Sequence, residues 1–259
     1  MLLITCALPL EAAPLKRRLK LSRLPGPYFM AAGEKAALIV SGPGRYEAAA
    51  AAAYLACAVR PGEDALFANL GLAGGEGYAV GDVVLASPVG APGEADLYPE
   101  MLYAHPFKTG RMLTHGRPVQ KALGETVLVD MEGYGFAKTA LRLAGPQNTV
   151  LIKIVSDVLG RGLPNRSQAE DLAERLAESA LPFLTELDEA VSARALTASE
   201  RDGLFALAEA ARFTESQRQQ LIRAARIHKG RRGVLPSLPT PGKEERRDYL
   251  LRLLAALRS

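Results

Sequence analysis

The chain has 259 residues, of which 48% are hydrophobic and 23% are charged, as in ordinary folded globular proteins. This composition argues against disorder of the whole chain, and no apolar run approaches the roughly 18 residues that a membrane-spanning helix needs. The net charge of +4 is unevenly spread, because residues 211–259 carry 12 basic and 4 acidic side chains whereas residues 1–210 carry 20 and 24. We therefore expect the C-terminal segment to serve a different purpose from the body of the chain.

The two cysteines, Cys6 and Cys57, are too few for a disulfide framework and lie in apolar surroundings. They predict buried, reduced thiols and hence a cytoplasmic protein. The first 19 residues do not have the form of a signal peptide, since their basic residues follow the apolar run instead of preceding it. Three histidines and two cysteines without ligand spacing argue against a zinc site, so we expect no metal.

Short apolar runs alternate with helical patterns along the first 195 residues. The predicted strands lie at 2–7, 28–32, 36–41, 65–70, 82–87, 111–114, 126–130 and 149–156. The glycine-rich residues 71–77 are predicted to connect one strand to the next. The predicted helices lie at 45–59, which is rich in alanine, at 132–143 and at 167–195. This alternation predicts an α/β layered domain with a largely buried sheet.

From residue 197 onward the pattern is helical only, which predicts an α/β domain at 1–195 and a basic helical extension at 196–259. Two helix starts have the capping-box form, at Thr197 and at Thr214. Gly230 is predicted to end the second helix, and Thr240 to begin the last one. An extension of about 60 residues is small for independent folding, so we expect its apolar faces to dock on the body or on a second subunit.

Three segments of the body place acidic or small residues at strand ends, where α/β sheets bind ligands. Glu11 follows the first strand, and its alternative interpretation is a helix-start residue. Gly42 precedes an alanine-rich helix whose backbone amides suit an anion or hydroxyl, unless it only forms a tight turn. Gly71 allows close backbone approach in the same way, or belongs to a plain connection between strands.

Two further pairs lie at strand ends. Met131 and Glu132 occupy a strand-to-helix junction, and Ser156 and Asp157 end the most strand-like run of the chain. Taken alone, Met131 is typical of a core residue and Asp157 of a helix N-cap.

Together and in this order, these segments resemble the nucleoside phosphorylase superfamily, and most closely its methylthioadenosine/S-adenosylhomocysteine nucleosidases. The matching pieces are ITCALPLEAAPL, SGPGRYEAAAA, FANLGLAGG followed by VGDVVLAS, VDMEGYGFA and IKIVSD, over roughly residues 1–190. The resemblance implies a three-layer α/β/α sandwich with a mixed, partly barrel-like sheet, to which this chain adds its helical extension.

The resemblance also implies roles for single residues. Glu11 matches the glutamate that activates the attacking water, and Asp157 matches the aspartate that protonates the purine at N7. Met131 matches the methionine under the ribose, Glu132 the glutamate that binds its hydroxyls, and Ser156 would orient Asp157. A positioned acid and a carboxylate near an oxocarbenium-like sugar suit this chemistry. Gly42, Arg45 and Gly71 are the further candidate binding residues, and no cofactor is implied.

This sequence departs from the family pattern at several positions. Leu70 and Leu72 stand where the family has Thr and Ser, and Lys153 replaces an arginine. The interval from Asp82 to Met131 is short, and the segment RMLTHGRP lacks the aromatic residue that stacks on the purine. The sugar end of the site thus resembles the family while the base pocket differs from it.

The primary hypothesis is a nucleosidase that cleaves the N-glycosidic bond of a purine-type nucleoside by water attack. One alternative is a phosphate-dependent phosphorylase, for which Arg45 beside Gly42 is the candidate phosphate ligand. Another is a non-catalytic nucleoside- or nucleotide-binding module.

The resemblance implies a homodimer without membrane attachment. The basic residues 223–232 have helical spacing and form either a solvated face, which we favour, or a nucleic-acid contact.

Overall fold

The computed structural model describes residues 1–62, 64–119, 121–242 and 244–258. The chain divides into two compact units, Met1–Glu189 and Ala190–Ser259. The division falls inside helix α4 (Arg166–Ala193), six residues before the boundary expected from the sequence. Within the described residues, no helix has both the length and the apolar character that crossing a membrane requires.

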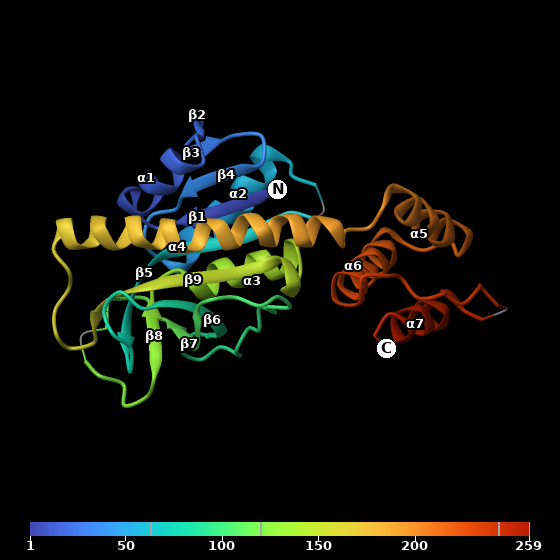
Figure 1. The fold of residues 1–259 in the computed structure, drawn as a ribbon. Helices are drawn as coiled ribbons and strands as arrows, with labels where there is room; N and C mark the ends of the chain where they lie inside the picture. The colour runs from blue at the N-terminus through green and yellow to red at the C-terminus, as the bar shows by residue number, and fades with distance from the viewer. Residues whose placement is uncertain (63, 120, 243, 259) are drawn as a thin grey trace. The chain divides into compact units, whose positions relative to one another are not determined.

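The first unit is built on one mixed sheet (Figure 1). Its strands in the described residues are β1 (Leu2–Cys6), β2 (Ser22–Leu24), β3 (Phe29–Ala32), β4 (Ala36–Val40), β5 (Leu66–Glu76), β6 (Val83–Gly90), β7 (Lys108–Thr114), β8 (Val127–Asp130) and β9 (Thr149–Val158). The strand order is β2-β3-β4-β1-β5-β8-β7-β6-β9. Because β5 also pairs with β9, the strands β5, β8, β7, β6 and β9 close into a barrel-like ring.

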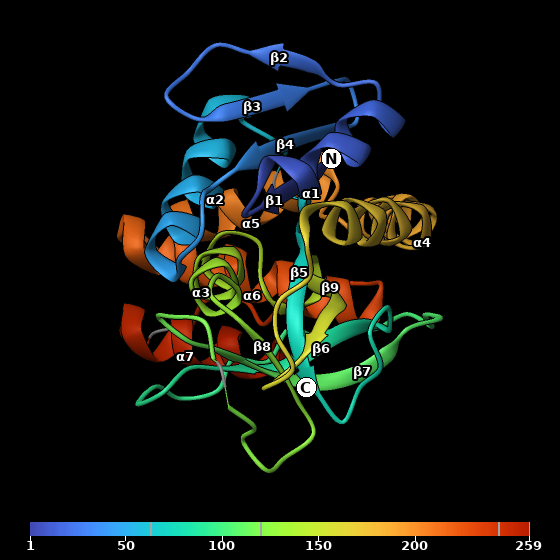
Figure 2. The same cartoon turned by 90° about the vertical axis from the view of Figure 1, so that its left-hand side faces the viewer.

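Helices cover both faces of this sheet (Figure 2). Helices α1 (Pro9–Arg18) and α4 lie on one face, and α2 (Arg45–Val59) and α3 (Gly133–Leu143) lie on the other. Glu174 of α4 accepts hydrogen bonds from Arg17 and Arg18 at the end of α1, which connects α1 to α4. This arrangement confirms the predicted three-layer sandwich with a mixed, partly barrel-like sheet.

Strand β5 extends through most of the glycine-rich segment that the sequence predicted to be a connection. Its first residues pair with β1, its last residues pair with β8, and almost its whole length pairs with β9. Hydrogen-bonded partners on both edges offset the low strand propensity of glycine, which local sequence reasoning cannot foresee.

The pairing of β5 with β9 contains a β-bulge. Ala73 lies opposite Val155 but Gly74 lies opposite Asp157, so Ser156 is the extra residue. A bulge changes the direction in which the neighbouring side chains point. Here it lies at the strand end where the sequence predicted a functional pair.

The second unit contains helices α5 (Ala198–Ala210), α6 (Glu215–Arg232) and α7 (Arg246–Ala256). Thr197 and Thr214 cap the first two helices through the predicted capping boxes. The expected docking on the body or on a second subunit stays a prediction, but the apolar faces of the three helices pack against one another. Their buried residues are Leu196, Leu204, Ala208, Leu221, Ile222, Ala225, Tyr249, Leu250, Leu253 and Leu257.

Two predicted helix ends in this unit are wrong. Helix α6 continues past Gly230 to Arg232 and is capped by Gly233, whose φ of 81° lies in the left-handed region that favours glycine. Helix α7 begins at Arg246 with Glu245 as its N-cap, whereas Thr240 belongs to the preceding connection.

Candidate active site

A cavity of about 230 Å³ opens in the first unit at the carboxyl ends of β1, β8 and β9, beside residues 72–74 within β5. Five of the predicted site residues line it: Glu11, Met131, Glu132, Ser156 and Asp157. They come from the first turn of α1, the junction between β8 and α3, and the end of β9. The fold thus brings together segments that lie far apart in the sequence.

Glu11 is held in a fixed orientation by backbone amides. Its Oε2 accepts hydrogen bonds from the N–H groups of Ala7 and Leu8, both at 2.9 Å, and its Oε1 accepts one from Leu72 at 2.8 Å. The side chain is only 5% exposed. A Cβ atom on Gly71 would lie 2.7 Å from Oε1, so this carboxylate can pack against β5 only where a glycine stands. Gly71 was a candidate binding residue in the sequence, but it does not line the cavity and instead leaves room for Glu11.

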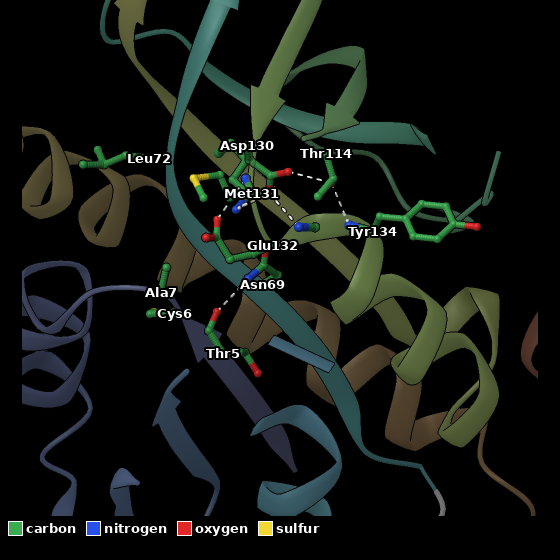
Figure 3. Close-up of polar contacts among 12 residues, drawn as sticks. Thr5, Cys6, Ala7, Asn69, Leu72, Thr114, Asp130, Met131, Glu132 and Tyr134 are labelled. Carbon is green, nitrogen blue, oxygen red and sulfur yellow. Dashed lines mark hydrogen bonds and ion pairs between the residues drawn. The ribbon is translucent and has the colours of Figure 1, made fainter. Parts of the chain in front are cut away.

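Glu132 is held by the turn that precedes α2. Its Oε1 accepts a hydrogen bond from the N–H of Gly44 at 3.0 Å, and its Oε2 accepts one from Met131 at 3.3 Å (Figure 3). Gly44 has a φ of 124°, which only glycine adopts readily. The backbone amide that the sequence offered to an anion is thus occupied by a carboxylate of the protein itself.

The structure does not bring Gly42 and Arg45 to this cavity, although Pro43 between them lines it. The Arg45 guanidinium lies over the Tyr46 ring, 4.9 Å from its centroid, and donates a hydrogen bond to the Tyr46 hydroxyl at 3.0 Å. Arg45 lines a separate hollow of about 130 Å³, together with Tyr134. A segment with two glycines and an arginine resembles a phosphate loop in sequence, but its turn directs the arginine elsewhere.

Ser156 and Asp157 lie at the β-bulge, near the end of β9. The Ser156 hydroxyl lies 2.5 Å from Asp157 Oδ1 and 3.2 Å from the carbonyl oxygen of Ala73. Asp157 is half-buried, and its Oδ2 would lie 3.3 Å from a Cβ on Gly74. The serine is thus hydrogen-bonded to the carboxylate that the resemblance implies it orients, and a glycine leaves room beside this carboxylate.

A buried ion pair beneath the cavity was not predicted from the sequence. Lys153 Nζ lies 3.0 Å from Asp130 Oδ2, and the two side chains are 2% and 0% exposed. The Asp130 carboxylate also points to the Thr114 hydroxyl, 2.7 Å away, and this hydroxyl accepts the N–H of Tyr134 (Figure 3). The signal for the pair was a lone lysine in an apolar strand, since a buried ammonium needs a partner.

Burial raises the pKa of both glutamates of the cavity. Attraction to Lys153 opposes the rise for Glu11, as do the N–H groups of Leu72 and Leu8. Attraction to Lys153 also opposes the rise for Glu132, whereas repulsion from Asp130 adds to it.

No group of three or more His, Cys, Asp or Glu side chains in the described residues is arranged to hold a metal ion.

The remaining wall of the cavity is mostly apolar. Arg117, Pro118 and Val119 of the connection between β7 and β8 line it, together with Leu72 and other leucines. His115 of the same connection does not line it, and Leu70 is buried in the core. Among the residues that the structure describes, this lining includes no aromatic side chain.

The connection that forms this wall is anchored at its far end. Glu76 at the end of β5 accepts hydrogen bonds from the N–H groups of Leu123 and Gly124, at 2.5 and 3.0 Å. This anchor was not predicted, because the sequence gives no sign that a strand-end carboxylate meets a distant turn.

No protein-family model matches the chain, and no curated protein matches it. Solved structures do share its fold. The apo 5′-methylthioadenosine nucleosidase of Arabidopsis thaliana is 20% identical, with a TM-score of 0.59 over 72% of this chain and 95% of that one. An aspartate-to-asparagine variant of a Chlamydia trachomatis nucleosidase (MTAN), bound to methylthioadenosine (MTA), is 23% identical, with a TM-score of 0.57 over 72% and 98%.

The MTA/S-adenosylhomocysteine (SAH) nucleosidase of Colwellia psychrerythraea, in complex with adenine, is 21% identical, with a TM-score of 0.58 over 73% of this chain and 94% of that one. Each of these nucleosidases is matched over nearly its whole length, while more than a quarter of this chain lies outside the match. The chain therefore shares the fold of these MTA/SAH nucleosidases over nearly their whole length and has further residues outside the match.

Proposed function

We propose that this chain is a nucleosidase, which hydrolyses the N-glycosidic bond of a purine-type nucleoside related to MTA or SAH. The observation that carries the proposal is the presence of Glu11, Glu132 and Asp157 in the lining of one cavity. A base, a sugar-binding carboxylate and an acid are the groups that this reaction requires. We assign the reaction to the α/β body, predicted as residues 1–195, and not to the extension 196–259.

Glu11 is the proposed general base. An ionised carboxylate offers about four acceptor positions, and the N–H groups of Ala7, Leu8 and Leu72 occupy three of them. The remaining position on Oε1 is available to a water molecule, whose proton Glu11 accepts as the water attacks the anomeric carbon. The raised pKa of the buried carboxyl suits this role, because a base works best when its pKa lies near the working pH.

Asp157 is the proposed acid that protonates the leaving base, with Ser156 holding its carboxyl group. Met131 and Glu132 are the proposed sugar contacts: the thioether packs under the ribose and the carboxylate accepts from its hydroxyls. As the bond breaks, positive charge develops on the sugar. The carboxylates that surround the cavity stabilise this charge more than they stabilise the neutral substrate.

Water is the proposed acceptor, and three features favour it over phosphate. Arg117 is the only basic residue in the lining of the cavity, within the residues that the structure describes. The Gly44 amide is occupied by Glu132, and Arg45 packs on Tyr46 outside the cavity. A phosphate site needs several convergent donors, and carboxylates in their place repel a phosphate.

The proposed substrate class rests on the fold neighbours and on the wall of the cavity. Their structures contain MTA in one case and adenine in another. In this chain Pro118, Val119 and Leu72 offer an apolar surface for a base or a 5′ substituent. A homodimer, a cytoplasmic location and a solvated rather than nucleic-acid-binding extension remain predictions from the sequence.

The proposal is tested by incubating the full-length protein with MTA, SAH, adenosine and inosine, with and without phosphate. Release of free base is followed by chromatography. We expect release in the absence of phosphate from at least one of these nucleosides. Release only with phosphate would instead identify a phosphorylase. Nucleoside binding by calorimetry without release of base would identify a binding module.

A further inference from the structure

Lys153 lies in the middle of β9 and is almost completely buried. One of its three N–H donors is used by Asp130, at 3.0 Å. Asp130 has further partners, because Oδ2 also accepts the N–H of Gly133 at 2.8 Å and Oδ1 accepts the Thr114 hydroxyl at 2.7 Å. The aspartate thus has three partners, on β7, β9 and the start of α3, whereas the lysine has donors and charge to share.

The register of the sheet places Lys153 beside Glu11. Lys153 is the strand partner of Gly71 in the parallel pair of β9 and β5, so the two residues face the same side of the sheet. That side is where Glu11 lies, since a Cβ on Gly71 would be 2.7 Å from Glu11 Oε1. The missing side chain of Gly71 therefore leaves a space that the Glu11 carboxylate occupies, and Lys153 is the strand neighbour of that position.

The charges of this cluster do not balance. Glu11, Asp130 and Glu132 contribute three buried carboxyl groups, and Lys153 is the one cation among them in the described residues. Burial opposes the charged ammonium, yet attraction to Asp130, Glu132 and Glu11 outweighs it and raises the pKa of Lys153. The other titratable group that faces Glu11 is the Cys6 thiol of β1, whose pKa burial raises. The lysine therefore stays charged and acts on all three carboxyl groups.

We propose that Lys153 is a positioning residue for the reaction: held in place by Asp130, it is the shared counter-ion that keeps Glu11 ionised as the general base. This role rests on the proposed function. The competing interpretation is structural, with Lys153 serving only to neutralise Asp130 under the start of α3. The two interpretations differ in what happens to Glu11 when the lysine and the aspartate are removed together.

The test compares the pH dependence of kcat/KM for base release in three full-length variants. Lys153→Met removes the charge, and loss of a cation raises the pKa of Glu11. The acidic limb of the variant's pH profile of kcat/KM should therefore move to higher pH by about one unit or more, which is about a tenfold loss of kcat/KM on that limb. Lys153→Arg keeps the charge and should keep the wild-type limb. Lys229→Met, at a buried lysine of the second unit, is the matched control and should also keep it.

The decisive variant is Lys153→Met combined with Asp130→Asn, which leaves no unpaired aspartate charge and thus protects the fold. If Lys153 is the counter-ion of Glu11, the acid limb of this double variant stays displaced. A double variant with the wild-type limb would overturn the proposal and assign the lysine to Asp130 alone. An unchanged limb in the single variant Lys153→Met would overturn it as well.

A second readout needs no turnover and so separates this proposal from the proposed function. Carboxyl ¹³C NMR of the free protein follows the titration of Glu11, whose resonance is assigned by its loss in Glu11→Gln. We expect Glu11 to titrate at higher pH in both methionine variants than in the wild type. Equal titration in all of them contradicts the counter-ion role even if the wild type proves to be an active nucleosidase.

Discussion

Each unit of this protein contains a buried lysine, and the two lysines differ in the number and burial of the carboxyl groups around them. Lys229 of α6 pairs with one carboxylate, Glu200 of α5, and the side chains are 7% and 28% exposed. The hydrogen bond from Lys229 lowers the pKa of Glu200, as expected of a simple pair. Around Lys153, by contrast, burial leaves Glu11 and Glu132 with raised pKa values in spite of the cation.

This difference separates a structural ion pair from a cluster suited to proton transfer. One cation for one carboxylate joins two helices and leaves no group poised to exchange a proton. One cation among three buried carboxyl groups leaves groups whose protonation changes nearer to neutral pH. Such a cluster costs stability, and proteins retain it where it has a use. The predictions below test whether the two units differ in this way.

The largest effect is expected for Asp157→Asn. The amide cannot donate the proton that the leaving base needs, so the rate of base release should fall by roughly 10²–10⁴-fold. The melting temperature should stay close to that of the wild type, because Asp157 is half-buried and its serine partner can bond to an amide oxygen. Near-normal turnover would remove Asp157 from the mechanism.

Glu11→Gln should abolish hydrolysis while nucleoside binding, measured by calorimetry, persists. The amide oxygen retains part of the hydrogen bonding to the N–H groups of Ala7 and Leu8, but an amide cannot accept a proton from water. If phosphate-dependent release survives in this variant, the acceptor is phosphate and the hydrolase proposal is wrong.

Gly71→Ala tests how closely Glu11 must pack against β5. The new methyl group would meet Glu11 Oε1 at 2.7 Å, so the carboxylate has to move. We expect kcat to fall at least about tenfold, since small misplacements of a catalytic group are costly. Unchanged kcat in a folded variant would show that the position of Glu11 tolerates displacement.

Lys229→Met should lower stability without touching the reaction. A partly exposed pair lies between surface and buried ion pairs, so we expect a loss of about 1–3 kcal/mol in the free energy of unfolding. Chemical denaturation measures this loss, and the assay of base release serves as the control. A changed pH–rate profile would contradict the separation of the two units into a reactive and a structural one.

The smallest effect is expected for Gly203→Ala in the interior of α5. A Cβ atom at this position has no neighbour within 4 Å, and alanine is the better helix former. The variant should gain about 0.5–1 kcal/mol of stability at unchanged activity. With Gly71→Ala it forms a matched pair, because the same methyl group is disruptive at the site and harmless in the helical unit.

The sequence predicted most elements of the fold and five of the residues that line the cavity. Helix α2 was predicted with its bounds, since an alanine run permits little else. Strand β5 was missed in part, because its glycines are held by partners distant in the chain. The pair of Asp130 and Lys153 was missed for the same reason, as it joins two strands across the ring. Arg45 was assigned to the site because local sequence does not reveal where a turn directs its side chain.

The account is tested most directly by identifying the sugar product that the wild-type protein forms from its preferred nucleoside. Mass spectrometry distinguishes the free sugar from its 1-phosphate after incubation in buffers with and without phosphate. The account predicts the free sugar at equal rates in both buffers, with loss of this product in Glu11→Gln and Asp157→Asn. Formation of the sugar 1-phosphate, with no product when phosphate is withheld, would contradict water as the acceptor and Glu11 as its base.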